Sequence, residues 1–156
     1  KIFFVGMILL VLIGGIFIIS ELVGSDNFEN EAVKVIDDIS YGVQYTTENS
    51  SEILFKGFVE NTSSEDLIIE HGELFTNYKV FDHQENEIQG VQKRSGDYAS
   101  ILNVTTLEPS KQLVEEMHTI LDLPKGEYTV LVQFSIDVEN RPEIVPADLE
   151  VALKVE

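Results

Sequence analysis

An unbroken apolar run near the N-terminus limits what this chain can fold into more than any other feature. From Ile2 to Ile19 the sequence has no charged and no polar side chain. As a helix this run would be about 27 Å long at about 1.5 Å per residue, close to the roughly 30 Å hydrocarbon core of a bilayer. Helices packed on a soluble core are amphipathic, whereas this run is apolar on every side. We therefore predict that residues 1–23 form a transmembrane helix or a helix in the core of a filament.

A cleavable signal peptide is the main alternative for this run. Signal peptides carry an apolar stretch of about 7–15 residues, followed by small residues at the cut. The run here is longer, although Val23-Gly24-Ser25 could serve as a weak cleavage site. Lys1 precedes the run and acidic residues follow it, and positively charged flanks tend to stay in the cytoplasm. We expect the N-terminus inside the cell and residues 26–156 outside it.

The acidic composition narrows the classes of partner. The formal net charge is −18 at pH 7, and the chain has no cysteine. Proteins bind nucleic acid by neutralising its phosphates with Lys and Arg, so a nucleic-acid partner is excluded. The lack of cysteine excludes thiol catalysis and cysteine-based zinc sites. A surface this acidic is typical of a protein that stays soluble in a cation-rich exterior or prefers basic partners.

Alternation of apolar and polar residues predicts β-strands in the rest of the chain. The clearest strand is 127–138, where apolar residues occupy every second position from Tyr128 to Val138, as one buried face of a strand requires. Leu131 is the apolar exception on the opposite face. A looser form of the same pattern predicts further strands at 39–45, 53–59, 67–70, 74–81, 98–106, 113–121 and 149–155.

Short strands separated by Gly, Pro, Asn, Asp and Ser indicate an all-β fold, an antiparallel β-sandwich of about seven to nine strands. We place this domain at 35–156 and expect a polar linker at 24–34. Gly57 interrupts a strand pattern, so we expect a bulge or a point of close packing there. The side chains expected to face the core in the clearest strand are Tyr128, Val130, Val132 and Phe134.

Residues that could carry catalysis or bind a metal do not form a recognisable motif. The three histidines, His71, His83 and His118, lack the paired spacing of zinc ligands, and no nucleophile elbow is present. The run Asp82–Glu87 is rich in oxygen ligands but lacks the spacing and central Gly of a calcium loop. Such a run is typical of a solvated hairpin loop. We expect no catalytic residue, no metal and no cofactor.

Three glycosylation sequons occur, at Asn49, Asn61 and Asn103. Asn49 and Asn61 fall in predicted loops, where a glycan could attach. A dibasic pair, Lys93-Arg94, lies in the segment 89–97 of an otherwise acidic domain. Because basic side chains in a flexible loop suit a proteinase with an acidic specificity pocket, we treat this pair as a candidate contact with a partner.

The order of several short motifs resembles one known family. These motifs run from about Tyr41 to the end of the chain, and each is generic to β-sandwiches when taken alone. They are Ile53–Val59 followed by Asn61-Thr62-Ser63, then Gly72-Glu73-Leu74-Phe75, Tyr78–Asp82, Leu107-Glu108-Pro109 and Lys125–Val130. In this order the chain resembles the BsuPI-type intracellular proteinase inhibitor family. The family pattern has Gly-Glu after the Pro, where this chain has Ser110-Lys111.

The resemblance implies an immunoglobulin-like sandwich that binds a proteinase without being turned over. Combined with the apolar run, it leads to our first functional hypothesis. The protein would be a non-catalytic, membrane-anchored module outside the cell, docking a loop or a sheet edge on another protein. It would be held in the membrane by residues 2–19.

A pilin-like subunit of an extracellular filament is the alternative function. The uncharged helix would then pack with its copies in the filament core, with the sandwich outside. Lys1 as the first residue suits a processed pilin, whereas Val5 stands where most bacterial pilins carry Glu. The two hypotheses differ in the partner, which is another protein in the first and further copies of the chain in the second.

Overall fold

The computed structural model describes residues 28–46, 52–94, 101–139 and 147–156. The predicted apolar helix at 2–19 and the sequon at Asn49 lie outside these ranges. Within them, no helix is long and apolar enough to cross a membrane. The described part of the chain is all-β, with every strand pairing antiparallel.

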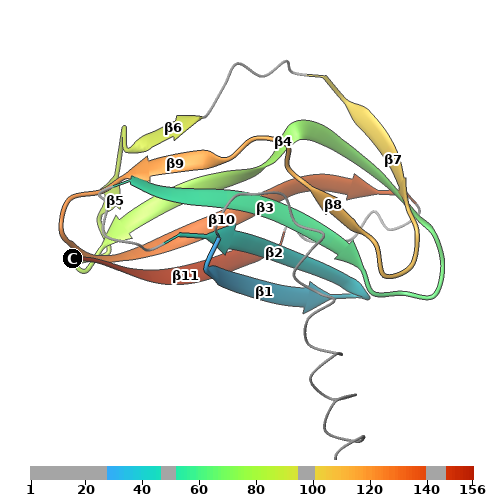
Figure 1. Cartoon of the computed structure of the whole chain (residues 1–156), viewed down its shortest axis with the longest axis horizontal. Helices are drawn as coiled ribbons and strands as arrows, with labels where there is room; N and C mark the ends of the chain where they lie inside the picture. Colours follow the sequence, from blue (N-terminus) through green and yellow to red (C-terminus); the bar gives the residue numbers. More distant parts are fainter. Residues whose placement is uncertain (1–27, 47–51, 95–100, 140–146) are drawn as a thin grey trace, which may run out of the picture.

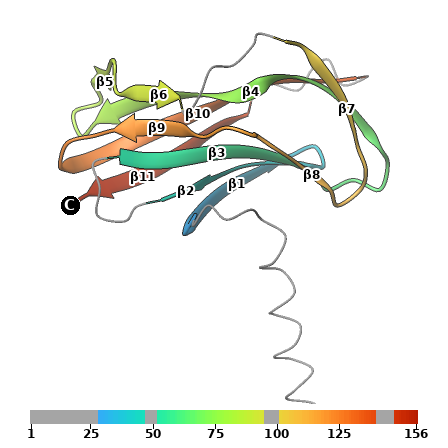
Figure 2. The same cartoon turned by 45° about the horizontal axis from the view of Figure 1, so that its top comes forward.

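Two sheets pack face to face (Figures 1 and 2). The first, sheet A, has the strand order β1-β2-β3-β9-β6, with β8 also paired to β3. Its strands are β1 (Asn30–Ile36), β2 (Ile39–Tyr45), β3 (Glu52–Asn61), β6 (Gln92–Arg94), β8 (Gln112–Val114) and β9 (Thr119–Asp122).

The second sheet, sheet B, has the order β11-β10-β4-β5, with β7 also paired to β4. Its strands are β4 (Leu67–Asp82), β5 (Glu87–Ile88), β7 (Asn103–Leu107), β10 (Gly126–Val138) and β11 (Asp148–Val155). In both figures β7 lies at the margin of the molecule, away from the C-terminus.

The core between the sheets is built from the alternating apolar residues. The four residues predicted to face inward in β10 are at most 9% exposed, which confirms that prediction: Tyr128, Val130, Val132 and Phe134. Aromatic pairs join the two sheets across the core. Tyr41 of β2 meets Phe134 edge-on at a centroid distance of 5.3 Å, and Phe55 of β3 lies 5.2 Å from Tyr78 of β4. Such pairs stabilise beyond the area that they bury.

The boundaries of four predicted elements were wrong. The sandwich begins at Asn30, because β1 includes residues 30–34 of the segment predicted as a linker at 24–34. The predicted strands 67–70 and 74–81 are one continuous strand, β4. The predicted strand 113–121 is two strands, β8 and β9, which both pair with β3.

A large bulge explains why β4 looked like two strands. Thr76 pairs with Phe134 of β10, and His71 pairs with Ile136, so one residue of β10 faces the four residues 72–75 of β4. Extra residues on one strand leave backbone groups without a partner in the ladder. These groups need hydrogen-bond partners from elsewhere, since buried N–H groups are costly to leave unpaired.

Candidate functional site

A buried carboxylate supplies the partners that the β4 bulge needs. Glu115 follows β8 directly and is 1% exposed. It accepts hydrogen bonds from the backbone N–H groups of Phe75 and Thr76 in β4, at 2.8 Å each. It also accepts one from the N–H of Gly57 in β3, at 2.9 Å. A single side chain therefore ties sheet A to sheet B.

The position of Gly57 is the close-packing point that the sequence indicated. A Cβ atom there would lie 2.4 Å from the Cγ2 atom of Thr76 and 2.9 Å from a carboxylate oxygen of Glu115. Neither approach is compatible with a side chain, so only glycine lets β3 come this close to the carboxylate.

A hydroxyl chain extends this network to Tyr78. The Thr76 hydroxyl lies 2.8 and 2.9 Å from the two carboxylate oxygens of Glu115 and 2.9 Å from the Tyr78 hydroxyl. Because a hydroxyl has one proton to donate, Thr76 donates to Glu115 and Tyr78 donates to Thr76. Burial raises the pKa of Tyr78 well above 10.0, and the charge of Glu115 raises this pKa further. The network is buried between the sheets and joins them.

The dibasic pair lies on a strand, whereas we expected a flexible loop. Lys93 and Arg94 belong to β6, where they pair with Ile120 and Thr119 of β9. The Lys93 ammonium lies 2.8 Å from a carboxylate oxygen of Asp122 and 4.0 Å from one of Glu52. Its hydrogen bond to Asp122 raises the pKa of Lys93. Part of the positive charge of Lys93-Arg94 is therefore already paired with carboxylates of the same domain.

The acidic run is a hairpin turn, as its composition indicated. It connects β4 to β5, which pair with each other. One carboxylate oxygen of Asp82 accepts hydrogen bonds from the backbone N–H groups of Gln84 and Asn86, at 2.8 and 2.9 Å. The bonds from Asn86 are the main cause of a lowered pKa for Asp82. This carboxylate therefore serves the turn.

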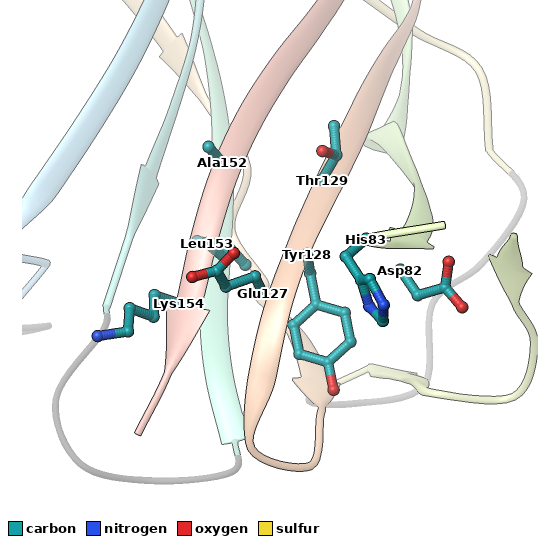
Figure 3. Close-up of a pocket in the computed structure, with 8 residues that line it drawn as sticks. All are labelled: Asp82, His83, Glu127, Tyr128, Thr129, Ala152, Leu153 and Lys154. Atoms are coloured by element: carbon teal, nitrogen blue, oxygen red, sulfur yellow. The ribbon is translucent and has the colours of Figure 1, made fainter. Parts of the chain in front are cut away.

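A surface hollow of about 380 Å³ lies beside this turn (Figure 3). It is lined by Asp82, His83, residues 127–129 of β10 and residues 152–154 of β11. Its polar groups make local bonds: the Tyr128 hydroxyl donates to the Pro124 carbonyl at 2.8 Å, and Lys154 pairs with Glu156 at 2.7 Å. These bonds hold the β9–β10 connection, which crosses from sheet A to sheet B, and the end of β11.

The three histidines lie in different parts of the fold. His71 is buried in β4, and its Nδ1 donates to the carbonyl of Gly72 at 2.7 Å while Nε2 lies 2.9 Å from the Thr105 hydroxyl of β7. His83 lies in the β4–β5 turn, and His118 precedes β9. In the described ranges no group of three His, Asp or Glu side chains is placed to hold a metal ion.

The structure corrects one predicted glycosylation site. The Asn61 side chain is 0% exposed, and its amide nitrogen donates to the carbonyls of Glu65 and Leu107 at 2.7 and 2.8 Å. A glycan replaces one of the two protons on that nitrogen and so removes one of these bonds, and the buried side chain has no exposed surface for the sugar. Asn61 shapes the β3–β4 connection instead. Asn103 is half-buried on β7, opposite His71, and its glycosylation stays a prediction.

Exposed apolar side chains gather around the edge strand β7. Val104 is 62% exposed, Leu102 just before the strand is 69% exposed, and Ile101 is 52% exposed. Ile68 of the neighbouring β4 adds another exposed apolar side chain, at 39%. We call these four residues, together with the side of β7 that no described strand pairs with, the β7 edge. An uncharged edge strand with several exposed apolar side chains is a candidate interaction surface.

Acidic residues flank the β7 edge on the same outer face of sheet B. Val104 pairs with Glu70 of β4, and Glu70 pairs with Asp137 of β10. Residues paired across strands lie side by side on one face, so Asp137, Glu70 and Val104 form one row running to the edge. All three side chains are exposed.

Sequence reasoning found the uncharged segment that contains β7 but not its place in the fold. The predicted strand 98–106 overlaps β7 at 103–106. Alternation cannot tell an edge strand from a central one. The visible signal is that residues 101–107 contain no charged side chain in a chain of net charge −18.

Comparisons with known proteins do not identify a family. No family model matches the chain, and no curated protein matches it by sequence. Three similar solved structures are a FixG-related protein from Vibrio parahaemolyticus, the putative ApaA protein from Bordetella pertussis and the GAE domain of GGA2p from Saccharomyces cerevisiae. Their TM-scores are 0.43, 0.41 and 0.38, at 11%, 16% and 12% identity. The matches cover 78%, 80% and 82% of this chain and 99%, 95% and 98% of those chains.

Proposed function

We propose that the protein is a non-catalytic, membrane-anchored module that binds another protein through the β7 edge. The apolar run 2–19 is the membrane anchor, and the sandwich faces outward from the cell. The observation that carries this proposal is the exposure of Leu102 and Val104, 69% and 62%, on an uncharged edge strand. Peptide recognition commonly adds a strand to such an edge, where backbone hydrogen bonds supply affinity.

Charged residues normally protect the edges of a sheet from pairing with other chains. Two other long edge strands of the described part follow this rule. In β1, Lys34 reaches across the sandwich and donates to the backbone carbonyl of Asp148 at 2.9 Å. In β11, exposed charged residues alternate with buried apolar ones: Asp148, Glu150 and Lys154. The edge strand β1 also exposes apolar side chains, Val33 and Val35, but only β7 among these three edges has no charged residue, so we assign the partner to β7.

The sequence resemblance to BsuPI-type inhibitors supports a proteinase as one class of partner and an immunoglobulin-like arrangement of the strands. We place the main contact at β7 and not at Lys93-Arg94. The reason is that Lys93 already pairs with Asp122 and Glu52, whereas burying Val104 and Leu102 removes apolar surface from water.

The proposal is tested by comparing two valines of equal exposure on different edges. Val104 of β7 and Val35 of β1 are each 62% exposed. The full chain is extracted from its native membranes in a mild detergent, as wild type, Val104→Lys and Val35→Lys, and resolved by native electrophoresis. We expect a complex with a second protein for wild type and Val35→Lys and its loss for Val104→Lys. The same migration for all three chains would contradict the proposal.

A further inference from the structure

We infer that the segment docking on the β7 edge is an extended strand in which a Lys or Arg is flanked, two positions away on each side, by apolar residues. This inference rests on the proposed binding function and adds the chemistry of the partner. It follows from the row of side chains that runs from Asp137 through Glu70 to Val104.

The two acidic residues of this row are opposite each other in the register of the sheet. Glu70 and Asp137 are register partners on β4 and β10, and both side chains are exposed. Like charges placed opposite each other on neighbouring strands are destabilising. A cation brought to this position would relieve that repulsion, so this part of the surface favours a basic group on the partner.

The spacing between strands determines which residue of the added strand can bring a cation near Glu70 and Asp137. A strand added beside β7 would lie about 5 Å from β7 and about 10 Å from β4 at the backbone. The residue of the added strand opposite Val104 would extend the row of Asp137, Glu70 and Val104 by one position. The stem of a Lys or Arg at this position would cover Val104, and its charged end would extend toward the carboxylates.

The neighbouring positions of the added strand call for apolar residues. Side chains two residues apart on a strand point to the same face. The residues two before and two after the cation would therefore lie beside Leu102 and Thr106, next to Val104 on the outer face. Leu102 is 69% exposed, and Ile68, the register partner of Thr106, is 39% exposed. Covering these two side chains with apolar residues is favourable.

A second copy of this chain fits the site less well. Two β7 strands paired with each other would bring the Glu70 and Asp137 rows of both copies to the same face. The chain already has a net charge of −18, so this pairing adds like charges without supplying a cation. A basic segment of another protein therefore complements the negative charge of this surface, whereas a second copy of the chain does not.

The test uses three short peptides of the pattern Ser-Val-Thr-Arg-Thr-Val-Ser. One carries Arg at the centre, one carries citrulline, which has the same shape without the charge, and one carries Glu. Binding of each to the full chain in detergent micelles is followed by fluorescence anisotropy at low salt, where exposed charges are least screened. We expect the Arg peptide to bind about tenfold more tightly than the Glu peptide, with citrulline between them, as a few exposed charge pairs allow.

Two matched double variants test whether Glu70 and Asp137 cause the preference for the Arg peptide. The double variant Glu70→Gln/Asp137→Asn should lower the affinity for the Arg peptide about three- to tenfold and leave the citrulline peptide unchanged. The control Glu127→Gln/Glu150→Gln removes the same charge from exposed positions of β10 and β11 and should leave the preference for Arg intact. Thermal unfolding of each variant verifies the fold.

Several results would overturn the inference. Equal binding of the Arg and Glu peptides, or an Arg preference that survives Glu70→Gln/Asp137→Asn, would show that these carboxylates do not select the partner. Binding by none of the three peptides would also overturn it. The native-electrophoresis comparison of Val104→Lys with Val35→Lys uses the natural partner, so it can succeed or fail independently of the peptides.

Discussion

The carboxylate of Glu115 accepts a hydrogen bond from the backbone nitrogen of Gly57, a residue 58 positions earlier in the chain. The same carboxylate accepts from Phe75 and Thr76 of the opposite sheet. These hydrogen bonds stabilise the bulge in β4. The part of β4 that precedes the bulge pairs with β7. The β7 edge therefore lies beside a part of sheet B that hydrogen bonds from Glu115, across the core, stabilise.

Replacing this carboxylate should destabilise the domain strongly. In Glu115→Gln one acceptor oxygen becomes a donor, which leaves at least one buried N–H group unpaired at about 1–3 kcal/mol per group. We expect a loss of about 2–4 kcal/mol in the free energy of unfolding. Urea unfolding of Glu116→Gln, the exposed neighbour, is the control and should differ from wild type by less than about 0.5 kcal/mol. Equal urea midpoints for the two variants would show that Glu115 does not join the sheets.

The buried phenol of Tyr78 should make the domain sensitive to alkali. Its pKa in the folded state lies well above the ordinary value of 10.0, so the unfolded state releases this proton first as the pH rises. Stability from this group is fully present below pH 10 and is lost as the pH rises above it. Urea unfolding of wild type between pH 8 and pH 11 should therefore show a steeper loss of stability than unfolding of Tyr78→Phe. Parallel curves for the two proteins would contradict this assignment.

The alternation in β10 predicts unequal effects of two neighbouring substitutions. Phe134 is 3% exposed and contacts Tyr41, whereas Gln133 lies on the outer face. Phe134→Ala should cost about 3–5 kcal/mol, the usual range for a buried Phe, and Gln133→Ala should cost little. The difference is read from the two urea midpoints, and comparable midpoints would mean that the face of the strand is misassigned.

The apolar run should decide whether the protein enters a membrane. The full chain is expected to stay with the membrane fraction after alkaline carbonate washing, because a helix of about 18 apolar residues can span a bilayer. A shortened chain beginning at Asp26 keeps all of β1, which starts at Asn30, and should be soluble and folded. Full chain that remains monomeric in plain buffer would argue against the anchor.

Strands with a strict alternation could be predicted from the sequence. Those such as β10 and β11 bury nearly all of one face, so every second residue is apolar. The edge strand β1 escaped detection because Lys34 stands between Ala32 and Ile36 in the alternation and interrupts the apolar pattern. The bulge in β4 was hidden because the carboxylate that stabilises it comes from a residue 39 or more positions away. Local patterns do not contain such a contact.

The candidate site illustrates the same limit. The uncharged segment around β7 is visible in the sequence, yet its exposure follows from strand order, which depends on long-range pairing. Lys93 and Arg94 were chosen as the only dibasic pair, but Asp122, which binds Lys93, lies 29 positions away. Asn61 has the pattern of a glycosylation sequon, and only its burial shows that it serves the fold.

Cross-linking in living cells tests the central claim, docking through the β7 edge, most directly. A photoreactive amino acid is placed at Val104 or, as a matched control of equal exposure, at Val35, in the full chain expressed in its native cells. The account predicts a discrete adduct with a second protein after irradiation from position 104 and none of the same mass from position 35. No adduct from position 104, the same adduct from both positions, or an adduct only with further copies of this chain would contradict it.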